Sequence, residues 1–200
     1  STIEALQLAD GTNAITLGSE SESAGIVSIY GGTGADTITV AAYSTNGVTI
    51  DAGAGADVIT GGAGNDTFVI DSGDVTAGES YDGGSGNADN LKILSSMDLS
   101  ALDVAGSLNN VEIITLSDGV AITFSGAFLS GETLALNGTT NNFGETVSVN
   151  GASGNDTINL SGITVDTNDI TGLYIDGAAG NDSISGTNGA DTILGGDGDD

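Results

Sequence analysis

Residues 31–39 read GGTGADTIT, and this nine-residue pattern decides the fold because it returns along the chain. Further copies stand at residues 52–60 (AGAGADVIT), 61–69 (GGAGNDTFV), 151–159 (GASGNDTIN), 177–185 (GAAGNDSIS), 186–194 (GTNGADTIL) and, incomplete, 195–200 (GGDGDD). Residues 83–91 (GGSGNADNL) form a degenerate copy with one extra residue before the aspartate. Seven copies in one frame, some of them spaced by nine residues, predict a repeat architecture.

Each copy combines a tight turn with a short strand. Glycines at the first, second and fourth positions permit positive φ angles and a sharp reversal. The last three residues, such as residues 37–39 (TIT), favour an extended strand with one inward apolar side chain. Because turn and strand reverse the chain and the next copy brings it back, equivalent turns stack every two copies, about 4.8 Å apart.

The charge balance requires a cation. The 200 residues include 28 acidic ones and a single basic one, Lys92, which gives a formal net charge of −27. Disorder is disfavoured because 38% of the residues are hydrophobic and the acids are spread along the chain. Stacked turns also bring their aspartates together, and Ca²⁺ accepts six to eight carboxylate and carbonyl oxygens at about 2.3–2.6 Å. Metal ions are therefore the expected neutralising partners.

These copies resemble the RTX family of calcium-binding nonapeptides, G-G-x-G-x-D-x-U-x, in which U is a large apolar residue. The resemblance implies an all-β fold, a right-handed parallel β-roll or β-solenoid, interrupted here by a metal-free β segment. It also implies that each ion lies between turns two units apart, held by their aspartates and turn carbonyls.

In the first half of the chain, the resemblance assigns the following residues to calcium turns: Gly31, Thr33, Gly34, Asp36, Gly53, Ala54, Gly55, Asp57, Gly62, Ala63, Gly64, Asp66, Gly84, Gly86 and Asp89. In the second half it assigns Gly151, Ser153, Gly154, Asp156, Gly177, Ala179, Gly180, Asp182, Gly186, Asn188, Gly189, Asp191, Gly195, Asp197, Gly198 and Asp200.

The course of the coil pairs these aspartates. The expected pairs are Asp36 with Asp57, Asp66 with Asp89, Asp156 with Asp182, and Asp182 with Asp200. Asp191 is expected to meet the loop that carries Asp166 and Asp169. About five calcium ions would bring the formal charge from −27 to about −17.

Other acidic residues are interpreted as calcium-independent. Asp71, Asp74, Asp166 and Asp169 are expected in solvated loops, and a calcium role for them remains the alternative. Asp10 and Asp118, each followed by glycine, are interpreted as tight-turn residues, with calcium binding as the alternative.

A longer period divides the chain into two related modules, residues 1–108 and 109–200. Residues 3–11 (IEALQLADG) match residues 111–119 (VEIITLSDG), for example. Calcium turns fill residues 31–89 of the first module and 151–200 of the second. Residues 91–149 are expected to form metal-free strands, with a short helical turn near residues 96–102. The last copy stops in mid-repeat, so we expect the sequence to be part of a longer protein.

One large apolar residue per strand is expected to point inward and build a narrow core. The members of this inward ladder are Ile38, Ile50, Ile59, Phe68, Ile158, Ile175, Ile184 and Ile193.

Several function classes are excluded by composition. With no His and no Cys, triads of the Ser-His-Asp or Cys-His type and common zinc sites cannot form. A P-loop and an EF-hand loop are absent from the sequence, and we expect no enzyme. A single basic residue disfavours nucleic acid and anionic membranes as partners, and no apolar run reaches the length of a membrane span.

The sequence therefore predicts a calcium-binding structural module of a secreted bacterial surface-layer, adhesin or matrix protein. It would fold on binding extracellular Ca²⁺ and meet copies of itself or other surface components. The alternative is a secretion and folding module of an enzyme or toxin exported by a type I system, for which a longer unbroken run of repeats would be typical. A third class, recognition of ice or glycans, is disfavoured because Thr37, Thr39, Thr60 and Thr67 form no regular ladder.

Overall fold

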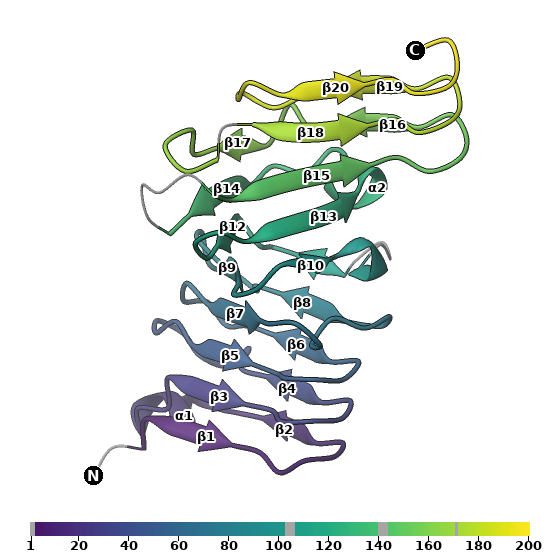
Figure 1. The fold of residues 1–200 in the computed structure, drawn as a ribbon. Coiled ribbons are helices and arrows are strands. Elements are labelled where there is room, and N and C mark those ends of the chain that lie inside the picture. The colour runs from purple at the N-terminus through teal and green to yellow at the C-terminus, as the bar shows by residue number, and fades with distance from the viewer. Residues whose placement is uncertain (1–2, 103–106, 140–143, 171) are drawn as a thin grey trace. The chain divides into compact units, whose positions relative to one another are not determined.

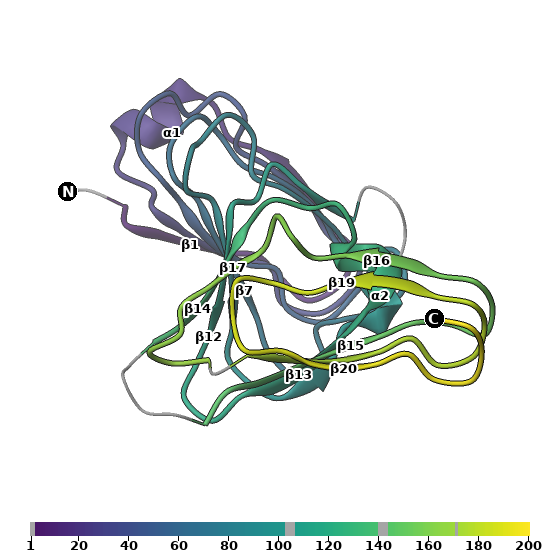
Figure 2. The same cartoon turned by 90° about the horizontal axis from the view of Figure 1, so that it is seen from above.

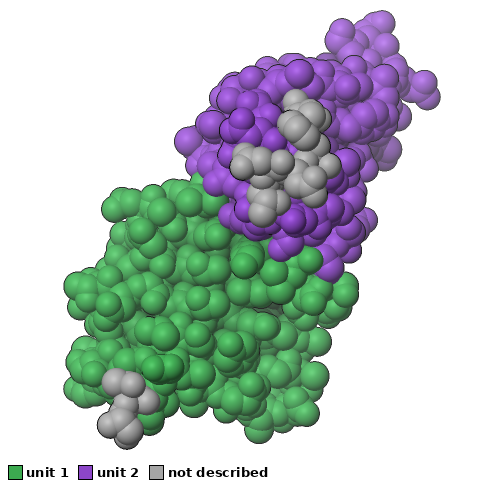
Figure 3. Space-filling model, turned by 60° about the vertical axis from the view of Figure 1, so that its left-hand side comes forward, with its two compact units in different colours: residues 1–94, 104–113 green, residues 95–103, 114–200 purple. Residues whose placement is uncertain are grey.

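The computed structural model describes residues 3–102, 107–139, 144–170 and 172–200, and nearly all of its regular structure is parallel β (Figure 1). The chain divides into two compact units, shown in Figure 3. Unit 1 comprises Ser1–Leu94 and Val104–Ile113, and unit 2 comprises Ser95–Asp103 and Ile114–Asp200. The module boundary at residue 108 concerns sequence duplication and stays a prediction.

Strands of unit 1 alternate between two sheets. The first sheet runs β1 (Ala5–Gln7), β3 (Ser28–Tyr30), β5 (Thr49–Asp51), β7 (Thr67–Ile70) and β9 (Asn90–Ile93). The second runs β2 (Ala14–Thr16), β4 (Thr37–Thr39), β6 (Val58–Thr60), β8 (Ser80–Asp82) and β11 (Leu108–Asn109). Neighbours are parallel, so the chain winds as a right-handed solenoid with two strands in each coil (Figure 1), which confirms the predicted fold class.

The core of unit 1 consists of apolar side chains stacked in register. Ile29 pairs with Ile50, and Ile50 with Phe68, while Ile38 pairs with Ile59 in the other sheet. These side chains are at most 1% exposed, because alternate residues of each strand point into the coil. The inward positions predicted from the repeat are therefore confirmed in this unit.

Unit 2 continues the same strand pattern. One sheet runs β10 (Met97–Asp98), β13 (Ala121–Ser125), β15 (Thr146–Asn150), β18 (Leu173–Asp176) and β20 (Thr192–Leu194). The other strands are β12 (Ile113–Leu116), β14 (Ala135–Gly138) and β17 (Thr164–Val165), which are successive neighbours, and the pair β16 (Thr157–Asn159) and β19 (Ser183–Ser185). In the view of Figure 2, β13, β15 and β20 lie over one another, as members of one sheet should.

Two members of the predicted inward ladder are not buried. Ile158 and Ile175 are 1% and 0% exposed, but Ile193 on β20 is 47% exposed and Ile184 is half-buried. β20 has a neighbour on one side only within its sheet, so no further coil covers these last apolar side chains.

Helical structure is short. The sequence suggested a helical turn near residues 96–102, and a 3-10 turn forms at Ser100–Leu102 after strand β10. Two helices were not predicted: α1 (Ser19–Ser23) and α2 (Gly126–Leu129), the second with Ser125 as its N-cap, whose Oγ accepts a 3.1 Å hydrogen bond from the amide of Phe128. No helix in the described part of the chain has the length and apolar character needed to cross a membrane.

Candidate metal centres

Carboxylates form a ladder along one row of turns in unit 1, the row that precedes β2, β4, β6 and β8. The amide of Asp36 donates a 2.7 Å hydrogen bond to Oδ1 of Asp57, one coil further on. In the same way the amide of Asn13 donates to Asp36 at 2.7 Å, and that of Asp57 to Oε1 of Glu79 at 3.4 Å. Each carboxylate thus sits against the backbone of the preceding turn, and we call this row the first ladder.

A second ladder runs along the opposite row of turns, which precedes β5, β7, β9 and β12. The amide of Val48 donates to Oδ1 of Asp66 at 2.8 Å, and the amide of Asp66 donates to Oδ1 of Asp89 at 2.7 Å. The ladder continues to Glu112, whose Oε2 accepts a 2.9 Å hydrogen bond from the amide of Asp89. Repeated turns therefore lie next to one another at Asp66 and Asp89, as the spacing predicted.

A ladder of the same kind runs through the last turns of unit 2. The amide of Asp156 donates to Oδ1 of Asp182 at 2.8 Å, and the amide of Asp182 donates to Oδ1 of Asp200 at 2.9 Å. All four aspartate pairs expected from the course of the coil are thus neighbours in the structure.

Asp191 contacts the backbone at the end of the preceding loop. Its two oxygens accept hydrogen bonds from the amides of Leu173 (3.0 Å) and Thr187 (2.6 Å). The turn of Asp191 thus lies against the loop that carries Asp166 and Asp169, as expected, while the acidic groups that influence Asp169 are Asp118, Glu145 and Asp166.

The third residues of stacked turns also pair. Parallel bridges join Thr33 to Ala54, Ser153 to Ala179, and Ala179 to Asp197. By contrast the amide of Ala63 donates to the carbonyl of Tyr43, so the turn at residues 61–66 lies on the irregular loop at 41–47 on one side and on the turn at 83–89 on the other.

The remaining predicted turn residues lie where the stacked turns touch. Gly53 packs on Gly32, Gly55 on Gly34, Gly64 on Asn46, Gly84 on Gly62, Gly86 on Gly64, Gly180 on Gly154, and Gly198 on Gly180. Asn188 differs because its side-chain oxygen accepts a 2.7 Å hydrogen bond from the amide of Val165. Gly189 belongs to the same turn, where its amide donates to Oγ1 of Thr187 at 3.0 Å.

Four ladder carboxylates have one oxygen buried without a hydrogen-bond partner in the described structure. These are Oδ2 of Asp36, Asp57, Asp89 and Asp182. Burying an ionised oxygen with no partner is strongly unfavourable, so each needs a proton or a cation. The other ladder aspartates are better satisfied: Oδ2 of Asp66 and of Asp156 each accept a 2.7 Å hydrogen bond, from the amides of Gly62 and Ala152.

Backbone carbonyls converge on these carboxylates at the first glycine of a repeat. A β-carbon added at Gly31 would lie 2.7 Å from Oδ2 of Asp36 and would collide with the carbonyl oxygen of Ala52 in the next coil. Gly83 has the same surroundings, with Oδ2 of Asp89 and the carbonyl of Asn110. Glycine thus lets a carboxylate and a carbonyl oxygen approach each other closely, and oxygen donors of these two kinds are those that Ca²⁺ prefers.

The donor set must combine side chain and backbone. No group of three or more His, Cys, Asp or Glu side chains that could hold a metal by itself occurs among the described residues. A cation between two turns would therefore have two carboxylates at most and would need the turn carbonyls. The donors present in the ladders fit a calcium ion of this kind.

The surroundings of the ladder carboxylates favour neutralisation of their negative charge. Burial raises the pKa of Asp57 to about 6, and the charge of Asp36 adds to the shift while the Asp36 amide opposes it. Burial also raises the pKa of Asp89 to about 6, with further contributions from the charges of Asp66 and Glu112. The pKa of Glu79 is raised to about 7, first by burial and also by the charges of Asp57 and Asp74. A cation close to these groups would reverse the shifts.

Glu79 and Glu112 were missed in the sequence because the copies were aligned on aspartate. Glu79 is 2% exposed and accepts a 2.8 Å hydrogen bond from the hydroxyl of Tyr81. A signal was present, since residues 78–80 (GES) place an acid directly before a strand, as residues 56–58 (ADV) do. A glutamate can therefore take the place of the repeat aspartate at the end of a ladder.

A family model of the RTX calcium-binding nonapeptide repeat matches the chain in 4 copies, at residues 23–42, 45–76 and 174–200. The turns at residues 83–91 and 151–159 lie outside these ranges, which together cover less than half of the chain. No curated protein and no solved structure matches the chain.

Proposed function

Because this chain belongs to the family of RTX calcium-binding nonapeptide repeats, we propose that it is a structural module of a secreted bacterial surface-layer, adhesin or matrix protein, which folds and stiffens on binding extracellular Ca²⁺. The observation that carries the proposal is the row of stacked carboxylates whose Oδ2 atoms are buried without a hydrogen-bond partner in the described part of the chain, as at Asp36 and Asp57.

Calcium acts as the folding switch. Without a cation the ladders bring like charges together in a chain of formal charge −27, and Lys92 is the only basic residue. The closed coil is then disfavoured by repulsion and by the burial of ionised oxygens. Since a preformed site is absent from the unfolded chain, the binding energy of each ion contributes to folding, about 2.7 kcal/mol at a concentration 100 times its dissociation constant.

About five ions account for the ladders. We assign one to each of the neighbouring pairs Asp36–Asp57, Asp66–Asp89, Asp156–Asp182 and Asp182–Asp200, and one to the turn of Asp191. The first and second ladders each extend to a glutamate, so Glu79 and Glu112 are additional ligands in this proposal.

The proposed role is mechanical and not catalytic. Calcium bound between successive turns would stiffen each run of stacked coils, which suits a protein that bears load at a cell surface. The alternative, a folding module of an exported enzyme or toxin, uses the same chemistry and differs in what the remainder of the protein does.

Circular dichroism and small-angle X-ray scattering in EDTA and in millimolar CaCl₂ test the folding switch. In EDTA we expect loss of the β-sheet signal and a larger radius of gyration, both reversed by Ca²⁺. Mg²⁺ at equal ionic strength is the control, because its octahedral geometry and tightly held water suit these turns poorly. A compact β-sheet chain in EDTA would overturn the proposal.

A further inference from the structure

Unit 2 contains a second group of acidic residues, outside every nonapeptide copy. It consists of Asp118 in the turn after β12, Glu145 directly before β15, and Asp166 and Asp169 in the loop after β17. These loops belong to successive coils, because β14 pairs with β17 and β13 pairs with β15. Asp118 is tied to the next coil by a 2.8 Å hydrogen bond from the hydroxyl of Thr139.

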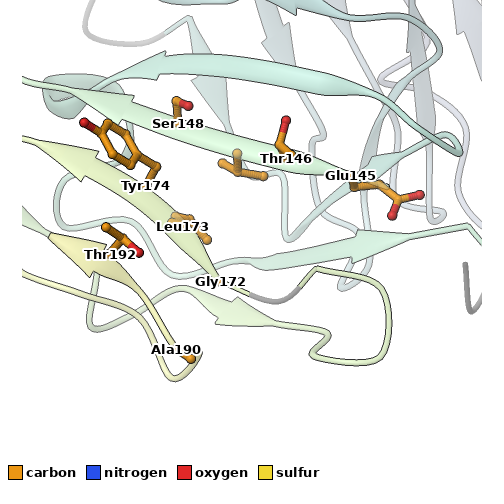
Figure 4. Close-up of a pocket in the computed structure, with 9 residues that line it drawn as sticks. Glu145, Thr146, Ser148, Gly172, Leu173, Tyr174, Ala190 and Thr192 are labelled. Carbon is orange, nitrogen blue, oxygen red and sulfur yellow. The ribbon is translucent and has the colours of Figure 1, made fainter. Parts of the chain in front are cut away.

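Glu145 is a buried carboxylate with nothing to bind in the described structure. Its side chain is 5% exposed, and both Oε1 and Oε2 are buried without a hydrogen-bond partner. It also lines a shallow hollow over β15, β18 and β20, but Figure 4 shows its carboxylate pointing away from Tyr174 and Thr192, past the beginning of the strand. The carboxylate is therefore directed toward the loops and not into this hollow.

The position of Glu145 corresponds to that of Glu79 in unit 1. Both follow a glycine and stand directly before a strand, in residues 78–80 (GES) and 144–146 (GET). Glu79 accepts a hydrogen bond from the backbone amide of Asp57 in the preceding coil. The amide level with Glu145 is that of Val120, which donates instead to the carbonyl of Ser117 at 3.1 Å. Glu145 thus has the ladder position without the ladder hydrogen bond.

Asp169 is the second buried carboxylate of the group. It is 5% exposed, its Oδ1 is buried without a partner, and its amide closes a turn onto the carbonyl of Asp166 at 3.2 Å. A β-carbon added at Gly138 would lie 2.9 Å from its Cγ and 3.0 Å from its Oδ2, so the preceding coil packs directly on this carboxylate. The expectation of a solvated loop is wrong for Asp169.

The members of the group influence one another. Burial raises the pKa of Asp169, and the charges of Asp166, Glu145 and Asp118 raise it further. Their negative charges thus share one region of the fold. Lys92, the only basic residue of the chain, belongs to β9 of unit 1.

We propose that Glu145 and Asp169 hold a further Ca²⁺ ion, at a site independent of the nonapeptide repeats. Two carboxylates from adjacent coils would supply the same kind of donor as Asp57 and Glu79, and backbone carbonyls and water would complete the shell of six to eight oxygens. Asp118 and Asp166 supply negative charge beside the ion. The site would fix the loops of unit 2 in the segment where no repeat turn does so.

Counting bound Ca²⁺ by flow dialysis tests this site. The double variant Glu145→Gln and Asp169→Asn is expected to bind one ion fewer than the unchanged protein. The control is Glu132→Gln, because residues 131–133 repeat the sequence GET but Glu132 is exposed, and it is expected to lose none. Circular dichroism at saturating Ca²⁺ checks that each variant is folded.

A separate readout is the amide NMR signals of residues 144–146 when traces of paramagnetic Gd³⁺ replace Ca²⁺ in the folded, calcium-saturated protein. We expect these signals to broaden in the unchanged protein and in Glu132→Gln, and not in the double variant. An unchanged ion count in the double variant, with its fold intact, would overturn this inference and leave the repeat sites standing. Absence of bound calcium in the unchanged protein would overturn the proposed function as well.

Discussion

The backbone amide of Asp36 and Oδ1 of Asp57 are joined by a 2.7 Å hydrogen bond, while Oδ2 of Asp57 is buried without a hydrogen-bond partner among the described residues. The two oxygens of this carboxylate therefore have different roles. Oδ1 locks the register of two stacked turns, and Oδ2 remains for a cation. The same division recurs at Asp89 and Asp182, so structure and metal binding depend on the same side chains.

Replacing both Asp36 and Asp57 with Asn should remove about one bound ion. An asparagine keeps an oxygen that can accept the ladder hydrogen bond, but it lacks the charge that attracts Ca²⁺. Isothermal titration calorimetry gives the stoichiometry, and Asp10→Asn, an exposed turn residue outside the ladder bonds, is the control. An unchanged ion count would show that these two turns do not share an ion.

Glu79→Gln should weaken calcium binding and stabilise the calcium-free fold. The amide removes a buried charge whose pKa is raised to about 7, and it retains an acceptor for the hydroxyl of Tyr81. The β-sheet circular dichroism that remains in EDTA at pH 7 and a calcium titration measure the two effects. Tyr81→Phe, which removes the hydroxyl and keeps the charge, should not raise the β-sheet signal in EDTA. Equal calcium affinity in Glu79→Gln and the unchanged protein would contradict a ligand role.

Acid should partly replace calcium. The folded-state pKa values of Glu79 (about 7), Asp57 and Asp89 (about 6) lie above the ordinary values of 4.5 and 3.8. The ionised forms therefore destabilise the calcium-free fold above about pH 7, and this penalty disappears as the groups protonate toward pH 4. In EDTA, β-sheet circular dichroism should increase between pH 8 and pH 5, while calcium affinity decreases over the same range. A β-sheet signal that falls steadily from pH 8 to pH 5 would contradict this.

Ionised Glu22 should stabilise the fold, in contrast to ionised Glu79, Asp57 and Asp89, and this stabilisation should be lost in acid. Its carboxylate accepts hydrogen bonds from the amides of Asn46 (2.9 Å), Thr45 (3.0 Å) and Ser44 (3.1 Å), and the Asn46 bond is the largest cause of a pKa lowered to about 2. Its stabilisation is present above the ordinary value of 4.5 and is lost as the pH falls through about 2. Glu22→Gln should thus lower stability at pH 7 but not at pH 2, measured by thermal denaturation with Ca²⁺ at pH 7 and without it at pH 2. Glu20→Gln, on the same helix, should change neither.

The repeat spacing accounts for much of the fold, and the reason is physical. Glycine turns and a single inward apolar residue fix the strand length, so β4, β6 and β7 lie where the pattern placed them. The pairing of Asp36 with Asp57 followed from counting turns, although the loop between β4 and β5 has no repeat sequence. A period of two strands per coil was sufficient for this inference.

Other features lay beyond the sequence because they depend on contacts between coils. Glu145 and Asp169 belong to no repeat, and their burial results from stacking of loops whose lengths differ. Helix α1 has no apolar face to reveal it, and its Glu22 matters only through the backbone of residues 44–46. Ile193 is exposed because β20 is an edge strand of its sheet among the described residues.

A mutation pair measures how far the core depends on this stacking. Ile59 is 1% exposed between neighbouring coils, whereas Ile193 is 47% exposed. With calcium saturating, Ile59→Ala should lower the free energy of unfolding by about 2–5 kcal/mol. Ile193→Ala should lower it by about 1 kcal/mol, since only part of its surface is buried. Denaturant titration compares them, and equal losses would contradict the assigned inward ladder.

The central claim, calcium clamped between stacked turns, is tested most directly by anomalous X-ray scattering from crystals grown in CaCl₂. We predict anomalous peaks between the turns of Asp36 and Asp57 and between those of Asp66 and Asp89, each within about 2.3–2.6 Å of a carboxylate oxygen and a turn carbonyl. A folded chain with stacked turns and no anomalous density between them would contradict the account.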